Sequence, residues 1–300
     1  MNTKINLAGV ELKNPVMTAS GTFGSGMEYS EFVDLNKLGA VVTKGVANVP
    51  WPGNPTPRIA ETYGGMINAI GLQNPGIDVF CERDIPFLKK YDTKIIVNVC
   101  GKSERDYVEV VERLAGEPVD MLEINISCPN VKEGGIAFGQ VPSSAEAITK
   151  AVKKVAKQPV IMKLSPNVTD ITEMAKAVEA GGADAVSLIN TLTGMKIDVN
   201  RRTFAVANKT AGVSGPAIHP IAVRMVYQVA NAINLPIIGM GGIRTAEDAL
   251  EMIMVGASAV AVGTANFNDP YTTIEVIDGI REYMEKNNVA DIKELIGCVR

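Results

Sequence analysis

The stretch PVIMKLS at residues 159–165 is apolar apart from Lys163 and the closing Ser165. Short, nearly continuous apolar runs are typical of strands buried on both faces, which occur in parallel sheets covered by helices. Seven more such runs are PVMTAS (15–20), GAVVTKG (39–45), IIVNVCG (95–101), MLEINIS (121–127), AVSLINT (185–191), PIIGMGG (236–242) and AVAVGTA (259–265). We therefore expect eight buried parallel strands.

Helical patterns lie between most of these runs, and three begin with a capping residue. Ser103 precedes ERDYVEVVERLAG, Asp170 precedes ITEMAKAVEAGG, and Thr245 stands three residues before Asp248. Alternation of strand and helix predicts an α/β fold, a closed (β/α)8 TIM barrel formed as one domain by residues 1–300. The alternative is an open doubly wound sheet, but GTFGSG (21–26) matches its glycine fingerprint poorly.

The segment KINLAGVEL (4–12) predicts a small N-terminal β-hairpin that could close one mouth of the barrel. Three longer intervals follow strands, at residues 46–77, 128–143 and 192–217. They therefore belong to the carboxyl face, where barrel active sites lie. Long loops at such a place are usually lids, binding loops or disordered spacers.

Composition excludes several functional classes. The chain has 300 residues and a formal net charge of −4, so it has no broad basic field for nucleic acid. Its four cysteines show no CxxC spacing and its single histidine is His219, which argues against a metal site or an iron–sulfur cluster in this chain. Because neither a secretory signal nor an apolar stretch of ~20 residues is visible, we expect a cytoplasmic protein without a membrane partner.

The most informative feature is the set of polar residues that interrupt or end the apolar runs: Ser20, Lys44, Asn98, Asn125, Lys163, Asn190 and Thr191. Each has an ordinary explanation on its own, since a lysine can extend to water and an asparagine can form a turn. Buried without partners, however, such groups each cost a few kcal/mol, roughly. Their convergence on one end of a barrel predicts a polar ligand.

Glycines end the last two strands. Gly241 and Gly242 precede a predicted helix, and Gly263 stands beside Thr264. Tight turns alone would explain each pair, but free backbone N–H groups at both loops together favour a phosphate site. Lys163 lies within its strand, where a buried ammonium needs an electron-rich neighbour such as a reduced flavin ring.

Cys128, in INISCPNVKEGGIAFG (124–139), is the candidate proton acceptor because it opens an inserted loop at the carboxyl face. A thiol with a perturbed pKa can act as a base near neutral pH. The alternative is an inert buried side chain, which we expect for Cys81, Cys100 and Cys298. His219 precedes Pro220 in the first turn of a predicted helix and is interpreted as structural.

These motifs resemble, essentially end to end, the class 1 dihydroorotate dehydrogenases, and most closely the catalytic subunit of the NAD-linked subtype 1B. The resemblance rests on ASGTFG (19–24), TKGV (43–46), NAIGLQNPG (68–76), NISCPNVKEGGIAFG (125–139), KLSPN (163–167), INT (189–191), GVSGPAIHPIA (212–222), GMGGI (239–243) and VGTA (262–265). It implies an FMN enzyme that oxidises dihydroorotate to orotate in pyrimidine biosynthesis, with Cys128 taking the C5 proton while hydride leaves C6 for the flavin.

The resemblance also implies roles for the other residues. The substrate would be held by Lys44, Asn68, Ala69, Ile70, Gly71, Leu72, Asn125, Asn190 and Thr191. The FMN would be held by Ser20, Lys44, Gly45, Asn98, Asn125, Lys163, Ile189, Gly215, Gly241, Gly242, Gly263 and Thr264. Asparagine amides suit a pyrimidine ring and Lys44 suits a carboxylate, which agrees with the residue-level interpretation.

The electron acceptor is left open by the residues. Subtype 1B implies a partner subunit with FAD and a 2Fe–2S cluster, in a heterotetramer of two catalytic and two partner chains built on a homodimer of this chain. The alternatives are a fumarate-dependent subtype 1A enzyme, a related dihydropyrimidine dehydrogenase, and a flavin-free phosphosugar isomerase or lyase. The last would leave Lys163 and Cys128 unexplained.

Overall fold

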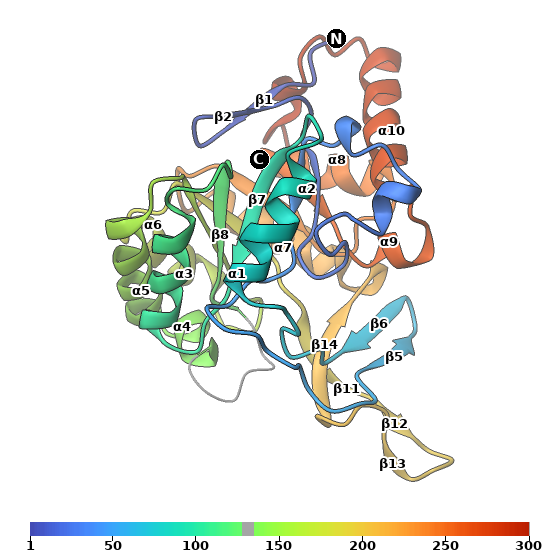
Figure 1. Ribbon diagram of the computed structural model, residues 1–300. Coiled ribbons are helices and arrows are strands. Elements are labelled where there is room, and N and C mark those ends of the chain that lie inside the picture. The colour runs from blue at the N-terminus through green and yellow to red at the C-terminus, as the bar shows by residue number, and fades with distance from the viewer. Residues whose placement is uncertain (128–134, 300) are drawn as a thin grey trace.

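The computed structural model describes residues 1–127 and 135–299. Eight parallel strands close into a barrel, and each of the eight predicted runs supplies one of them (Figure 1). They are β3 (Val16–Thr18), β4 (Ala40–Val42), β7 (Lys94–Val99), β8 (Met121–Asn125), β9 (Val160–Lys163), β10 (Ala185–Leu188), β15 (Ile237–Met240) and β16 (Ala259–Val262). Strand β16 pairs with β3, which closes the barrel and confirms the predicted fold.

Helices surround the barrel, and three of them begin at the predicted capping residues. Ser103 and Thr245 each accept a backbone hydrogen bond within a capping box, and the Asp170 side chain accepts from the Thr172 N–H. The helices are α1 (Ile77–Val79), α2 (Ile85–Leu88), α3 (Glu104–Leu114), α4 (Gly135–Gln140), α5 (Pro142–Val155), α6 (Ile171–Ala180), α7 (His219–Ala230), α8 (Ala246–Met254), α9 (Ala265–Asn268) and α10 (Thr272–Lys286). A π-helical turn (Phe80–Asp84) joins α1 to α2.

One connection departs from the expected alternation. Between β3 and β4 the chain forms two 3₁₀ turns, η1 (Tyr29–Glu31) and η2 (Leu35–Lys37), in place of a helix. Gly24 and Gly26 have positive φ values of 56° and 85°. Helix needs negative φ at every residue, so this glycine-rich segment interrupts it. Further 3₁₀ turns are η4 (Pro216–Ile218) and η5 (Ile292–Leu295).

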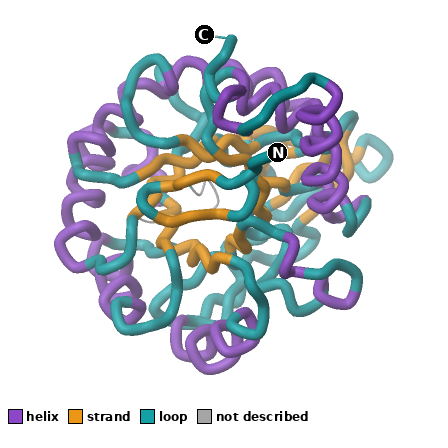
Figure 2. Tube along the Cα trace, turned by 90° about the horizontal axis from the view of Figure 1, so that it is seen from above, coloured by secondary structure: helices purple, strands orange, loops and turns teal. Residues whose placement is uncertain are grey.

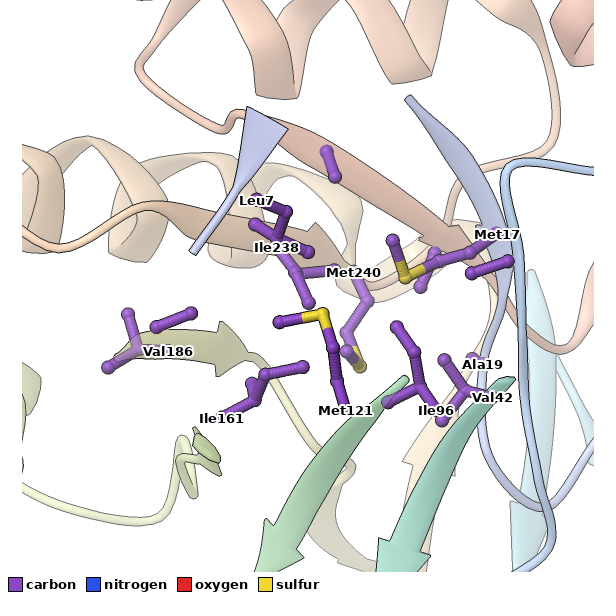
Figure 3. Close-up of a cluster of buried hydrophobic side chains, with 14 of the residues drawn as sticks. Leu7, Met17, Ala19, Val42, Ile96, Met121, Ile161, Val186, Ile238 and Met240 are labelled. Carbon is purple, nitrogen blue, oxygen red and sulfur yellow. The ribbon is translucent and has the colours of Figure 1, made fainter. Parts of the chain in front are cut away.

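The predicted N-terminal hairpin consists of β1 (Ile5–Leu7) and β2 (Val10–Leu12), paired antiparallel. Figure 2 shows it lying across one end of the barrel inside the ring of helices. Leu7 and Leu12 are fully buried, and Figure 3 shows Leu7 beside Ile238 of β15. The hairpin therefore closes this mouth, as the sequence predicts.

Two of the three long intervals pair with each other at the opposite end. Strands β5 (Ile59–Thr62), β6 (Gly65–Asn68), β11 (Leu192–Met195) and β14 (Thr210–Ser214) form one antiparallel sheet in the order β11-β14-β6-β5. The short hairpin β12 (Ile197–Asp198) and β13 (Thr203–Phe204) extends beyond it (Figure 1). Segments expected to be lids, binding loops or disordered spacers thus contribute four strands of an antiparallel sheet over the carboxyl end.

The barrel interior changes from apolar to polar along its axis. Side chains of a strand alternate between its faces, so residues two apart point the same way. Ile96 and Ile161 lie in the apolar cluster of Figure 3, and Asn98 and Lys163 follow them by two residues. All four are at most 4% exposed. The polar layer lies on the carboxyl side, one step beyond the apolar one.

Candidate active site

The polar layer is centred on a carboxylate that the sequence analysis did not single out. Glu123 of β8 is 1% exposed, and its Oε2 accepts a hydrogen bond of 2.6 Å from Asn98 Nδ2. Its Oε1 accepts a hydrogen bond of 2.7 Å from the hydroxyl of Ser187 in β10. Lys163 Nζ lies 3.7 Å from Oε2. Strands β7 to β10 therefore bring two predicted flavin contacts, Asn98 and Lys163, together around one buried charge.

A chain of side-chain hydrogen bonds continues from this layer toward the carboxyl mouth. Asn125 Nδ2 donates to Asn98 Oδ1 at 3.4 Å, and Asn125 Oδ1 accepts from the Ser127 hydroxyl at 3.0 Å. The same Ser127 oxygen accepts from Asn190 Nδ2 at 2.6 Å. The structure thus unites three predicted asparagines, and Ser127 is the bridge that the sequence analysis missed.

Lys44 and Gly45 lie beside this chain, directly after β4. A Cβ added at Gly45 would lie 3.0 Å from Asn98 Oδ1 and 3.5 Å from the Leu72 side chain, so these residues are close neighbours. A Cβ added at Gly21 would lie 3.8 Å from Lys44 Nζ. The ammonium of Lys44 therefore lies near the loop after β3, which contains the half-buried Ser20.

The inserted sheet supplies the remaining predicted substrate contacts. Asn68, at the end of β6, is paired with Gly212 of β14, and a Cβ at Gly212 would lie only 2.1 Å from Thr191 Oγ1. Asn68 and Thr191 thus meet at one glycine, although they are far apart in the sequence. The adjoining segment 69–72 leaves β6 and turns with positive φ at Gly71 and Leu72.

The predicted phosphate residues also come together. Gly215, Gly241 and Gly242 have φ values of 106°, 129° and 73°, and a Cβ at Gly242 would lie 2.9 Å from the Gly215 carbonyl oxygen. Thr264 Oγ1 donates to Ser214 Oγ at 2.7 Å, which joins the end of β16 to β14. Turns from three loops thus lie side by side, and glycine turns of this kind can bind an anion through their backbone N–H groups.

Ile189 and Gly263 complete the predicted set. A Cβ at Gly241 would lie 3.3 Å from Ile189 Cγ1, and one at Gly263 would lie 3.4 Å from the Ala19 Cβ. Ile189 is buried, so it packs under the Gly241 turn. Gly263 places the end of β16 against the end of β3, next to Ser20. Both therefore belong to the carboxyl mouth.

His219 lies at the first position of α7, as predicted, and connects this region to α8. Its Nδ1 is 2.9 Å from the Gly241 carbonyl oxygen and its Nε2 is 3.2 Å from Glu251 Oε2. The imidazole therefore anchors the Gly241 turn, in agreement with a structural role.

Cys128, the predicted base, lies outside the described residues. Ser127, the residue before it, is buried and bonded to Asn125 and Asn190. The residues missed by the sequence analysis, Glu123, Ser127, Ser187 and Ser214, carried one usable signal. Each is a polar residue inside or next to a predicted strand, like the polar residues that the sequence analysis did select.

Comparison with known proteins agrees with this geometry. A family model described as dihydroorotate dehydrogenase matches residues 2–284. The chain is 75% identical over 300 residues to "Dihydroorotate dehydrogenase B (NAD(+)), catalytic subunit" of Lachnoclostridium phytofermentans, with 100% of both chains covered. It is 67% identical over 299 residues to the protein of the same name from Alkaliphilus metalliredigens, covering 100% of this chain and 99% of that one.

A solved structure shows the same fold at much lower sequence identity. The crystal structure of DHODH in complex with ferulenol from Eimeria tenella superposes with a TM-score of 0.83 at 23% identity. The match covers 99% of this chain and 88% of the other. The family model and the highly identical relatives extend over almost the whole length. The chain therefore belongs to the dihydroorotate dehydrogenase family.

Proposed function

We propose that this chain oxidises dihydroorotate to orotate in pyrimidine biosynthesis, as the FMN-binding catalytic subunit of an NAD-linked enzyme. The observation that carries the proposal is the buried polar layer around Asn98 and Lys163, continued by Asn125 and Asn190 to the carboxyl mouth. Burying polar groups costs stability unless they are hydrogen-bonded, and here they line the place where barrel enzymes bind ligands. The identities of the two relatives support the reaction.

The residues present fit FMN. Gly215, Gly241 and Gly242 come together at the carboxyl end with positive φ, where their backbone N–H groups could hold a phosphate. Lys163 supplies a buried positive charge and Asn98 a buried amide for the edge of the flavin ring. When bound, FMN supplies the hydride acceptor that dihydroorotate oxidation needs. Residues 1–300 would then form one FMN-binding domain.

The substrate would lie between the flavin site and the inserted sheet. Amides of Asn68, Asn125 and Asn190 offer both donors and acceptors to a pyrimidine ring, and Thr191 adds a hydroxyl. Lys44 offers an ammonium to the substrate carboxylate. The backbone of residues 69–72 would line the opposite side, and the Leu72 side chain lies beside Gly45.

Cys128 is proposed as the base that accepts the C5 proton of dihydroorotate. Its chain neighbour Ser127 is hydrogen-bonded to two of the proposed substrate-binding asparagines. A general base must come within hydrogen-bond reach of the proton that it removes, and the chain leading to Cys128 ends its described part beside these asparagines. We predict that Cys128→Ser slows the reduction of bound FMN by dihydroorotate at least ~100-fold at pH 7, which is within the range of general base catalysis. FMN binding should stay unchanged. Equal reduction rates would remove Cys128 from this role.

The electrons would leave through a partner subunit, since the names of the relatives specify a catalytic subunit and NAD(+). We propose that this partner carries FAD and a 2Fe–2S cluster, and that two of each chain assemble in the cytoplasm around a homodimer of this chain. Co-expression with the partner should give NAD reduction that the isolated chain lacks. NAD reduction by the isolated chain, or fumarate reduction without a partner, would contradict this part.

The reaction itself is tested by anaerobic reduction of the FMN-loaded protein. We expect dihydroorotate to bleach the flavin absorption and to yield one orotate for each flavin reduced. Dihydrouracil should bleach it far more slowly, because it lacks the carboxylate that Lys44 would bind. Faster bleaching by dihydrouracil would favour a dihydropyrimidine dehydrogenase, and a protein that binds no FMN would contradict the proposal.

A further inference from the structure

Glu123 is a buried carboxylate for which the proposed reaction has no use as a base or a ligand contact. It lies on β8, between the two strands that carry residues with such uses, Asn98 on β7 and Lys163 on β9. Its two oxygens accept hydrogen bonds from Asn98 Nδ2 and from the Ser187 hydroxyl, at 2.6 and 2.7 Å. A carboxylate is costly to bury, so its retention in the barrel axis calls for an explanation.

The first consequence of Glu123 is the orientation of the Asn98 amide. Asn98 and Glu123 are register partners of the parallel pair β7–β8. An ionised carboxylate can only accept, so the NH₂ group of Asn98 must face it. The carbonyl oxygen of Asn98 then points away, toward Gly45, and accepts from Asn125 Nδ2 at 3.4 Å. Glu123 thereby fixes the Asn98 amide so that its oxygen, a hydrogen-bond acceptor, faces the carboxyl mouth.

The second consequence is the placement of the Lys163 ammonium. Lys163 Nζ lies 3.7 Å from Glu123 Oε2, with side-chain exposures of 5% and 1%. At this distance the two groups form an ion pair but no hydrogen bond. The N–H groups of Lys163 can therefore donate to another acceptor. In a low-dielectric interior the neighbouring negative charge is the main compensation for this ammonium. Removal of one partner would leave the other charge uncompensated.

We propose that Glu123 is a positioning residue for the flavin. It orients Asn98 and holds Lys163 beside the ring, and it acts on the flavin only through these two side chains. The inference rests on the proposed function for the identity of the cofactor, but not for the identity of the substrate. It predicts that loss of the Glu123 charge lowers the reduction potential of bound FMN, whereas the direct effect of that charge on the flavin would predict a rise.

The direction follows from two opposing effects of Glu123→Gln. Loss of a nearby negative charge would by itself raise the potential, because reduced flavin carries negative charge that the carboxylate repels. Loss of the Lys163 position would lower it, because the ammonium stabilises the reduced ring. If Glu123 acts through Lys163, the second effect dominates. The potential of E123Q should therefore fall below that of the unchanged protein, and FMN should dissociate at least tenfold more readily.

The experiment is a reductive titration of FMN-loaded protein with dithionite against a reference dye, together with FMN binding followed by flavin fluorescence. Asp84→Asn is the matched control. Asp84 is also a buried carboxylate, held by the Ser25 hydroxyl at 2.8 Å and Arg83 Nε at 2.6 Å, but it lies in the π-helical turn and not on a barrel strand. D84N should leave both the potential and FMN binding as in the unchanged protein. A fall in E123Q but not in D84N supports the inference.

Two further arms keep the inference falsifiable. In a Lys163→Met background, E123Q should no longer lower the potential, whereas a further fall would show that Glu123 acts by another route. If E123Q does not fold, Ser187→Ala replaces it. S187A removes one hydrogen bond from Oε1 and should weaken FMN binding at least threefold. An unchanged or higher potential in E123Q, or unchanged FMN binding in S187A, would overturn the inference.

Dithionite makes the test independent of the reaction. If dihydroorotate fails to reduce the unchanged protein while E123Q shifts the potential as described, the proposed substrate is wrong and the role of Glu123 stands. If dihydroorotate reduces the unchanged protein normally and E123Q matches it in potential and in FMN binding, the proposed substrate stands and the role of Glu123 is wrong.

Discussion

At the scale of single residues, the site is built from amides and glycines whose positions follow from their chemistry. Asparagine side chains both donate and accept, so Asn98, Asn125 and Asn190 form a continuous chain through Ser127 without leaving a buried group unpaired. Glycines stand where the backbone has positive φ and must approach a neighbour closely. Each of these requirements can be tested by one substitution.

Gly242→Ala should damage both the fold and the cofactor site. The added Cβ would meet the His219 Cβ at 2.7 Å and the Gly215 oxygen at 2.9 Å, at a φ of 73°. A non-glycine residue in such a conformation costs about 1–3 kcal/mol. We expect a loss of that size in the free energy of unfolding and at least a tenfold weaker FMN affinity, by urea titration and fluorescence.

Gly182→Ala provides the control. Gly182 also has a positive φ, of 91°, but a Cβ there would meet nothing within 4 Å, and it precedes β10 rather than following it. G182A should therefore cost a similar backbone strain without changing FMN affinity. Equal loss of FMN affinity in both variants would show that Gly242 has no special place in the phosphate site.

The Cys81 thiol makes the free energy of unfolding depend on pH at alkaline pH. Burial, followed by the charge of Glu117, raises the pKa of this thiol from 9.0 to about 11. Between these values the native state keeps a proton that the unfolded chain has lost, so stability falls as the pH rises through this interval. The unfolding free energy of the unchanged protein should fall more steeply from pH 9 to 11 than that of Cys81→Ala. Parallel curves would contradict this assignment.

At the scale of elements, the parts with local signals were predicted and those formed by distant pairing were not. Ser103, Asp170 and Thr245 begin helices because their side chains accept backbone hydrogen bonds two or three residues ahead. The sheet β11-β14-β6-β5 was missed because Asn68 pairs with Gly212 across a very long separation. No local pattern in two glycine-containing segments specifies that pairing.

The hairpin β1–β2 is an element whose contribution is stability rather than chemistry. Leu7 is fully buried and enters the barrel end opposite the site. Leu7→Ala should lower the free energy of unfolding by about 2–5 kcal/mol, as other core leucines do. Glu11→Ala on the exposed face of the hairpin should change it by less than ~0.5 kcal/mol. Unfolding in urea measures both, and comparable losses would exclude the hairpin as a plug.

At the scale of the whole molecule, the barrel was predictable because eight short, nearly continuous apolar runs are separated mostly by helical patterns. Closure then gathers all eight carboxyl ends, which explains why residues as distant as Gly45 and Thr264 belong to one site. The sequence could not show which polar residues satisfy one another. Glu123 was missed for that reason, since its importance lies in its contacts with Asn98, Lys163 and Ser187. Among the described residues no helix is long and apolar enough to cross a membrane.

The account depends on a flavin and a pyrimidine acid filling the polar carboxyl end of the barrel, and diffraction from crystals grown with FMN and orotate tests this most directly. We expect the flavin ring against Lys163 and Asn98, its phosphate at Gly242, and the orotate carboxylate at Lys44. Density for either ligand elsewhere, or a polar layer that touches neither of them, would contradict the account.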